Sequence, residues 1–219
     1  MMTEDTSLSP MPRWVRKLLI PALIGAASGA GASAGMMYFI DSPAVGGLGV
    51  SATIAAVVGA MYVVIGASIT FGTVNPQLGA KFLNVEDADE LREQKKMLAL
   101  SGVAMLLWGV ALVALALAAP DGPVPQSTAL AIGLGGLVIG SAMSVLIYRE
   151  CDELMLAVNL EGGALSSGLV FLVVGSWAVC AHLGYTAAPT PLDLLTLFYV
   201  LLLVASFIAV GRRGMLAIR

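Results

Sequence analysis

Six apolar runs, each about as long as a membrane-spanning helix, constrain this chain more than any other feature. They lie at roughly residues 18–40, 49–72, 97–119, 127–148, 163–185 and 192–211. A helix needs about 20 residues to cross about 30 Å of hydrocarbon. The runs do not alternate apolar and polar residues, as the strands of a membrane barrel do. The sequence therefore predicts an all-α integral membrane bundle of about six transmembrane helices.

The composition supports the same class of protein. Of the 219 residues, 58% are hydrophobic and 11% are charged, whereas a typical soluble domain has about 25% charged residues. So few charges leave too little polar surface to cover a soluble globule of this size. The net charge is −3 and no basic stripe is present, so nucleic acid is not an expected partner. The expected surrounding is the lipid bilayer.

The distribution of Lys and Arg predicts the orientation in the membrane. In a six-helix arrangement all 11 fall on one side: before the first run, between the second and third, after the fourth and after the sixth. Loops rich in Lys and Arg stay in the cytoplasm, so both termini are predicted to be cytoplasmic. Residues 1–12 are polar and are predicted to form a disordered cytoplasmic tail. Residues 13–219 are predicted to form one six-helix domain, with 73–96 as a cytoplasmic helical connection.

A cleavable signal peptide is the alternative interpretation of the first run. Arg13, Arg16 and Lys17 resemble the basic start of such a peptide, and residues 32–34 (Ala-Ser-Ala) resemble a cleavage site. Cleavage would leave five spans and an outer N-terminus. The run is rich in Gly and Ala and continues through residues 36–39, so we expect it to be retained.

Glycine pairs four residues apart indicate which helices pack most closely. Small residues at this spacing let two helix backbones approach each other. The first and fourth helices are therefore predicted to form the centre of the bundle, and a homodimer face is the alternative use of the same residues. The pairs are Gly25 and Gly29, Gly31 and Gly35, and Gly136 and Gly140.

The two longer cytoplasmic connections share a D-E-L sequence. It begins with Asp89 and Glu90 in the first connection and with Asp152 and Glu153 in the second. The repetition suggests a duplicated unit, although acids are favoured at helix N-termini in any case. These four acids are candidates for docking a partner, and an ordinary solvated helix extension is the alternative.

Glu161, with Asn159 near it, is the candidate for ion or proton handling. If the fifth helix begins at Asp152, Glu161 lies about 13 Å along it. It would then be inside the membrane, where a carboxylate is costly and usually functional. If the helix begins near Gly163, Glu161 is an ordinary interfacial acid. The sequence leaves both possibilities open.

This stretch resembles a group of bacterial polytopic inner-membrane proteins. In that group a D-E-[LM] follows the end of a transmembrane helix, and an L-E-[GA] comes shortly after it. The matching residues are 152–154 (Asp-Glu-Leu) and 160–162 (Leu-Glu-Gly). The resemblance implies location in a bacterial inner membrane and brings no assigned activity with it.

Three classes of function can be compared. The short loops and the lack of a catalytic cluster favour a non-catalytic accessory, assembly or scaffold subunit, which acts with a membrane-protein partner or as a homo-oligomer. Glu161 and the glycines permit a small ion- or proton-coupled transporter or channel. An enzyme is not expected, because His182 is the only histidine and no nucleophile–base pair is visible. Two Cys and one His are too few for a structural metal site, and no cofactor is expected.

Overall fold

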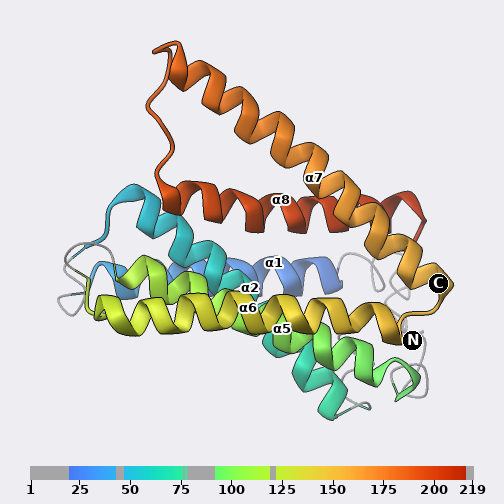
Figure 1. The fold of residues 1–219 in the computed structure, drawn as a ribbon. Coiled ribbons are helices and arrows are strands. Elements are labelled where there is room, and N and C mark those ends of the chain that lie inside the picture. The colour runs from blue at the N-terminus through green and yellow to red at the C-terminus, as the bar shows by residue number, and fades with distance from the viewer. Residues whose placement is uncertain (1–19, 43–46, 76, 78–91, 119–121, 216–219) are drawn as a thin grey trace, which may run out of the picture.

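The structure, a computed structural model, describes residues 20–42, 47–75, 77, 92–118 and 122–215. All regular secondary structure in these residues is helical (Figure 1), which confirms the all-α prediction for this part of the chain. The tail at 1–12 and most of the connection at 73–96 lie outside it. The helices are α1 (Ile20–Ile40), α2 (Val50–Val74), α5 (Lys95–Leu117), α6 (Gln126–Glu150), α7 (Glu153–His182) and α8 (Pro191–Arg212).

Five of the described helices, α2, α5, α6, α7 and α8, are long and apolar enough to cross a membrane. Each has 22 to 30 residues, and a rise of about 1.5 Å per residue makes the shortest about 33 Å long. The match between the predicted runs and these helices is close at most ends. The main difference is α7, which begins ten residues before the predicted start at 163.

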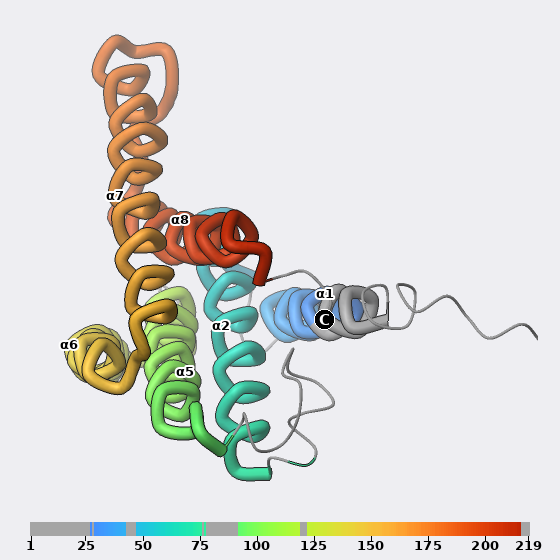
Figure 2. Tube along the Cα trace, turned by 90° about the vertical axis from the view of Figure 1, so that its right-hand side faces the viewer, coloured from blue at the N-terminus to red at the C-terminus, as the bar shows by residue number. Residues whose placement is uncertain are grey.

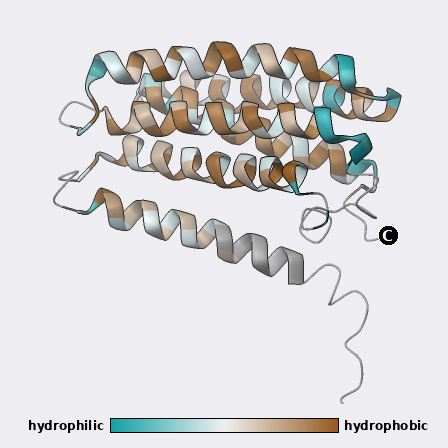
Figure 3. Ribbon diagram, turned by 90° about the horizontal axis from the view of Figure 1, so that it is seen from below, coloured by the Kyte–Doolittle hydropathy of each residue, from teal (hydrophilic) through white to brown (hydrophobic). Residues whose placement is uncertain are grey.

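Successive helices run up and down, so that the bundle has two ends. α2, α6 and α8 end, and α5 and α7 begin, at the end that we call the basic end, because it holds every described Lys and Arg. Figure 3 shows the most hydrophilic residues gathered there. These side chains are Arg92, Lys95, Lys96, Arg149, Arg212 and Arg213.

The helices form a row with a second, partial layer on top of it. α6, α5, α2 and α1 lie side by side in that order, α8 packs on α2, and α7 packs on α8 (Figure 2). The core lies where α2, α5 and α8 meet. Its fully buried side chains are mostly small, since Ala55, Ala56 and Ala111 have no exposed surface.

α2 and α5 form the most extensive helix contact, and four glycines make it possible. A Cβ added at Gly59 would lie 2.9 Å from the carbonyl oxygen of Gly109, and one at Gly109 would lie 2.7 Å from that of Gly59. Further along, a Cβ at Gly66 would lie 2.7 Å from the carbonyl oxygen of Gly102. The glycines are seven residues apart in each helix, so both pairs fall on one seam, where the backbones touch.

The prediction that α1 packs at the centre through its glycines does not hold for Gly29, Gly31 and Gly35. A Cβ added at any of them would meet no atom of the described residues within 4 Å. α1 lies at the edge of the row and contacts α2, with Ile40 buried in the core cluster. The surroundings of Gly25 lie outside the described side chains. Glycine spacing shows that close approach is possible, but it does not show that a neighbour uses it.

Gly136 and Gly140 do pack against a neighbouring helix, in this case α5. A Cβ added at Gly136 would lie 2.7 Å from the carbonyl oxygen of Leu107. One added at Gly140 would lie 2.5 Å from Nε1 of Trp108. The fourth predicted helix therefore uses its small residues inside the chain.

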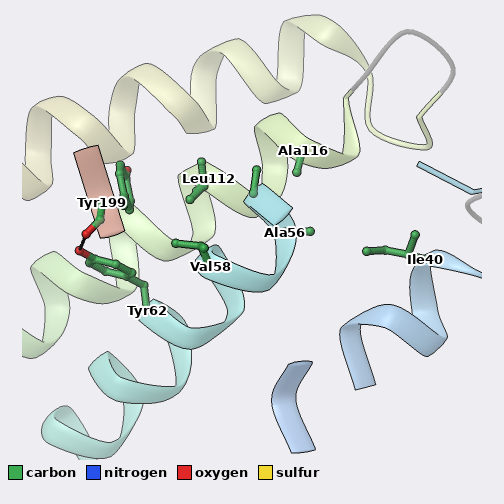
Figure 4. Close-up of a cluster of buried hydrophobic side chains, with 8 residues drawn as sticks. Ile40, Ala56, Val58, Tyr62, Leu112, Ala116 and Tyr199 are labelled. Atoms are coloured by element: carbon green, nitrogen blue, oxygen red, sulfur yellow. Dashed lines mark hydrogen bonds between the residues drawn. The ribbon is translucent and has the colours of Figure 1, made fainter. Parts of the chain in front are cut away.

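Two tyrosines join α8 to the rest of the core. Tyr62 of α2 is 1% exposed, and its hydroxyl donates to the backbone carbonyl oxygen of Tyr199 at 2.7 Å (Figure 4). The two rings meet edge to face with centroids 5.0 Å apart. A buried hydroxyl without a partner is costly, so this bond fixes the position of α8 along α2.

α7 diverges from the bundle. Its first half contacts α8 near the basic end, and its second half then leads away from the other helices (Figures 1 and 2). α6 and α7 make few contacts beyond the turn that joins them. The helix begins at an N-cap, because Oδ1 of Asp152 accepts a hydrogen bond from the Met155 N–H at 2.7 Å.

Candidate functional site

Glu161 faces the end of α8 and binds two arginines there. Its Oε1 accepts a hydrogen bond from Nη1 of Arg212 at 3.3 Å, and its Oε2 accepts one from Nε of Arg213 at 3.0 Å. The carboxylate side chain is 25% exposed, and those of Arg212 and Arg213 are 63% and 32% exposed. The site therefore has one negative and two positive charges, and one guanidinium is largely open to the surroundings.

The contact also shows how far along the bundle Glu161 lies. α7 begins at Glu153, so Glu161 lies about 12 Å from its start. At the same level α8 ends, because Arg212 is its last residue. Although α7 begins ten residues earlier than predicted, Glu161 therefore does not lie in the middle of the bundle. The residue lies level with the end of the neighbouring helix.

Asn159 takes part in a different set of contacts. Its Nδ2 donates to the backbone carbonyl oxygen of Met155 at 2.9 Å and to Sγ of Cys151 at 3.5 Å. Sγ of Cys151 in turn donates to Sδ of Met97 at 3.7 Å. Residues two apart on a helix do not face each other. The structure accordingly does not bring Asn159 and Glu161 together among the contacts of its described residues.

Cys151 lies in the turn between α6 and α7, where its thiol is partly buried. Burial raises the pKa of this thiol above its ordinary value. The hydrogen bond from Asn159 lowers the pKa in part, and the Asp152 carboxylate raises it. Cys180, in the second half of α7, is also a free thiol and is exposed.

Alkylation of Cys151 should therefore need a higher pH than that of an ordinary thiol. The thiolate is the reactive form, and a raised pKa leaves less thiolate at any given pH. In a Cys180→Ser background, the curve of iodoacetamide reaction rate against pH should be displaced upward. Asn159→Ala removes the bond that favours the thiolate, so it should displace the curve further. A downward displacement in the Asn159 variant would contradict this assignment.

The acids predicted to dock a partner fall into two groups. Asp152 is engaged as the N-cap of α7. Glu153 is the first residue of that helix and is exposed, where a negative charge suits the helix dipole. Asp89 and Glu90 lie outside the described residues.

A cavity of about 380 Å³ lies beside these contacts, between the α5–α6 pair and the α7–α8 pair. It begins near Val210, one turn before Arg213, and extends to Tyr62 and Trp108 in the middle of α2 and α5. Its wall is mostly apolar, with a few hydroxyl and amide groups between the apolar side chains. The polar lining residues besides the aromatic ones are Ser101, Ser144, Asn159 and Ser206.

Sequence reasoning missed the two arginines that hold Glu161. The sequence contained a signal for this contact, because Arg212 and Arg213 directly follow the last apolar run. In an up-and-down bundle the end of one helix lies beside the start of the preceding helix. The glycine seam was missed because its residues are seven apart rather than four. Among the described residues no group of three His, Cys, Asp or Glu side chains is placed to hold a metal ion.

No family model, curated protein or solved structure matches this chain.

Proposed function

We propose that the chain crosses a bacterial inner membrane six times, with both termini in the cytoplasm. Five helices have the length and apolarity to span, and the 21 residues of α1 give it a similar length. The described Lys and Arg residues share one end of the bundle, which the positive-inside rule assigns to the cytoplasm. The resemblance of residues 152–162 to bacterial inner-membrane proteins supports the same location.

Within this membrane, we propose that the protein is a non-catalytic accessory, assembly or scaffold subunit. It offers the second half of α7 to a transmembrane helix of a partner. The observation that carries the proposal is that none of the last 20 residues of α7, 163–182, which include this half, is buried. Phe171 is 84% exposed, and Val179 is 59% exposed. Twenty residues are enough to cross the hydrocarbon, so a stretch as long as a membrane span has no residue that the described chain buries.

Exposure to lipid alone does not require a partner, because lipid tails are as apolar as the helix. The small residues of α7 provide the further argument. Gly168 and Gly175 are seven residues apart, the same spacing as the glycines that join α2 to α5. A Cβ added at either would meet no atom of the described part of the chain within 4 Å. α7 thus repeats the pattern of a close helix contact and has the space for one open.

Photo-crosslinking in the membrane tests this proposal. A photoreactive amino acid at Phe171 should give a discrete protein adduct, and one at Val138 should give mostly lipid adducts. Val138 is a matched control because it is also apolar and 67% exposed, on a helix that packs against α5.

A second pair of variants separates a glycine contact from chance proximity. Gly168→Leu should abolish the adduct at position 171, because a large side chain prevents backbone approach. Gly135→Leu should not, although Gly135 is equally open. Equal protein adducts from positions 171 and 138, or an adduct that Gly168→Leu does not change, would reject the proposal.

The cavity supports a second candidate function, a small ion- or proton-coupled transporter or channel that uses Glu161. Hydroxyl and amide groups in the cavity wall extend from the basic end, where Glu161 lies, towards the middle of the bundle. Two features weigh against it: Glu161 is balanced by two arginines, and it lies level with the end of α8. Variants that remove or exchange the charges of Glu161 and Arg213 separate the two functions.

A further inference from the structure

The cavity at the basic end has the shape and lining of a site for a hydrocarbon chain. It runs from Val210, near the end of α8, to Tyr62 and Trp108 in the middle of the bundle. Its volume of about 380 Å³ lies within the usual range of about 300–1,000 Å³ for ligand sites. Among the described residues no charged side chain lines it. A mostly apolar cavity whose wall extends from near the end of α8 to the middle of the bundle suits the tail of a lipid.

The cavity has a route to the bilayer. α6 and α7 both contribute to its wall, yet these helices touch little beyond the turn that joins them. They move apart as they leave the basic end (Figures 1 and 2). A chain of the adjacent leaflet therefore reaches the cavity sideways, between α6 and α7, and remains parallel to its neighbours in the leaflet.

Charge at the mouth identifies the head group. Val210 of the cavity wall precedes Arg212 by two residues and Arg213 by three. One carboxylate, that of Glu161, serves both guanidinium groups. Arg212 contacts it through Nη1 alone among the described contacts and is 63% exposed. A guanidinium has five N–H donors, so Arg212 has donors left for an anionic oxygen at the membrane surface.

We propose that this cavity binds one phospholipid of the leaflet at the basic end. An acyl chain fills the cavity towards Trp108, and the phosphate accepts hydrogen bonds from Arg212. Glu161 keeps the two arginines together and leaves a net positive charge that matches the phosphate. This proposal rests on the membrane placement given above and not on the role of α7.

Native mass spectrometry of the delipidated protein, after addition of phosphatidylethanolamine or phosphatidylglycerol, tests the site. The wild type should retain one phospholipid of either kind. Ser206→Leu narrows the cavity and should reduce retention about tenfold. Ser68→Leu is the matched control, because Ser68 also donates to the carbonyl oxygen four residues earlier and lies outside the cavity. Loss of lipid in both variants, or in neither, would refute the site, as would a wild type that retains none.

The head group is tested separately. Arg212→Gln should weaken retention of both phospholipids about tenfold, whereas Lys95→Gln, a basic residue at the same end, should not. Diacylglycerol has the chains without the phosphate, so it should bind the wild type less tightly than either phospholipid. Equal retention of diacylglycerol would reject the role given to Arg212. If the two phospholipids are retained differently, the protein also recognises the group attached to the phosphate. That result would contradict recognition by the phosphate alone.

A measurement on the unaltered cavity remains informative if Ser206→Leu does not fold. With Trp14→Phe and Trp177→Phe, Trp108 is the only tryptophan, and it lines the inner part of the cavity. A phospholipid with a brominated acyl chain should quench its fluorescence, and the same lipid without bromine should not. Unchanged Trp108 fluorescence with the brominated lipid bound would overturn the proposal.

Discussion

Gly109→Ala should destabilise the protein by about 2 kcal/mol, although alanine is the better helix former. The added Cβ would lie 2.7 Å from both the Gly59 carbonyl oxygen and the Val63 backbone nitrogen. Both are backbone atoms of α2, so the helices must separate, and overpacking of this kind costs about 1–3 kcal/mol or more. The gain in helix propensity is about 1 kcal/mol and does not offset it. The midpoint of thermal unfolding in mild detergent measures the difference.

The same substitution at an open glycine is the control. Gly135→Ala on α6 and Gly35→Ala on α1 add a Cβ where no atom lies within 4 Å. Only the helix propensity then changes, so both variants should be as stable as the wild type or slightly more so. A Gly109 variant that unfolds at the same temperature as these controls would show that α2 and α5 are not in contact along this seam.

Glu161→Gln should lower stability by about 2 kcal/mol, the scale of hydrogen bonds to charged groups. The variant leaves Arg212 and Arg213 side by side without a counter-charge, where they repel each other. The end of α8 would then lose its attachment to α7. The unfolding midpoint and the amount of folded protein in the membrane report the loss.

Variants of the arginine side decide what Glu161 does. If the contact is structural, Glu161→Gln combined with Arg213→Gln should cost less than the sum of the two single changes, since both remove one interaction. The exchanged pair Glu161→Arg with Arg213→Glu should then recover much of the stability. For a transporter, Glu161→Gln should abolish coupled flux in a stably folded protein, and Arg213→Gln should preserve it. Additive losses of stability would contradict the structural role.

The spans could be predicted from the sequence because their signal is local. A run of apolar residues has to be about 20 residues long to cross the hydrocarbon, and proline and glycine mark its ends. At α8 the structure adds a capping box that the sequence analysis did not identify, in which the N-cap Thr190 and Asp193 of the first turn bind each other's backbone N–H groups. The start of α7 was harder to predict, because three of its first ten residues, Glu153, Asn159 and Glu161, are polar and extend the helix beyond the predicted apolar run.

The helix contacts could be predicted only in part, because they depend on which helices become neighbours. Gly136 and Gly29 have the same four-residue spacing to a second glycine, yet one touches α5 and the other has no neighbour within 4 Å of an added Cβ. The sequence showed that Glu161 carries a charge, but it did not show that arginines at the end of α8 neutralise this charge. That balance arises between residues about 50 positions apart, as the contact with Arg212 shows.

The glycine seam also bears on the order in which the chain assembles as it is synthesised. α2 and α5 follow each other among the described helices, and α6, which contacts α5 through Gly136 and Gly140, comes next. All three are complete at Glu150, before any of α7 is made. The N-terminal part of a chain is synthesised first, so the α7–α8 hairpin is added to α2, α5 and α6 after these three helices have been made. The α7–α8 hairpin attaches where the Tyr199 carbonyl oxygen of α8 accepts a hydrogen bond from Tyr62 of α2. The helices that form its binding surface have all been synthesised before it.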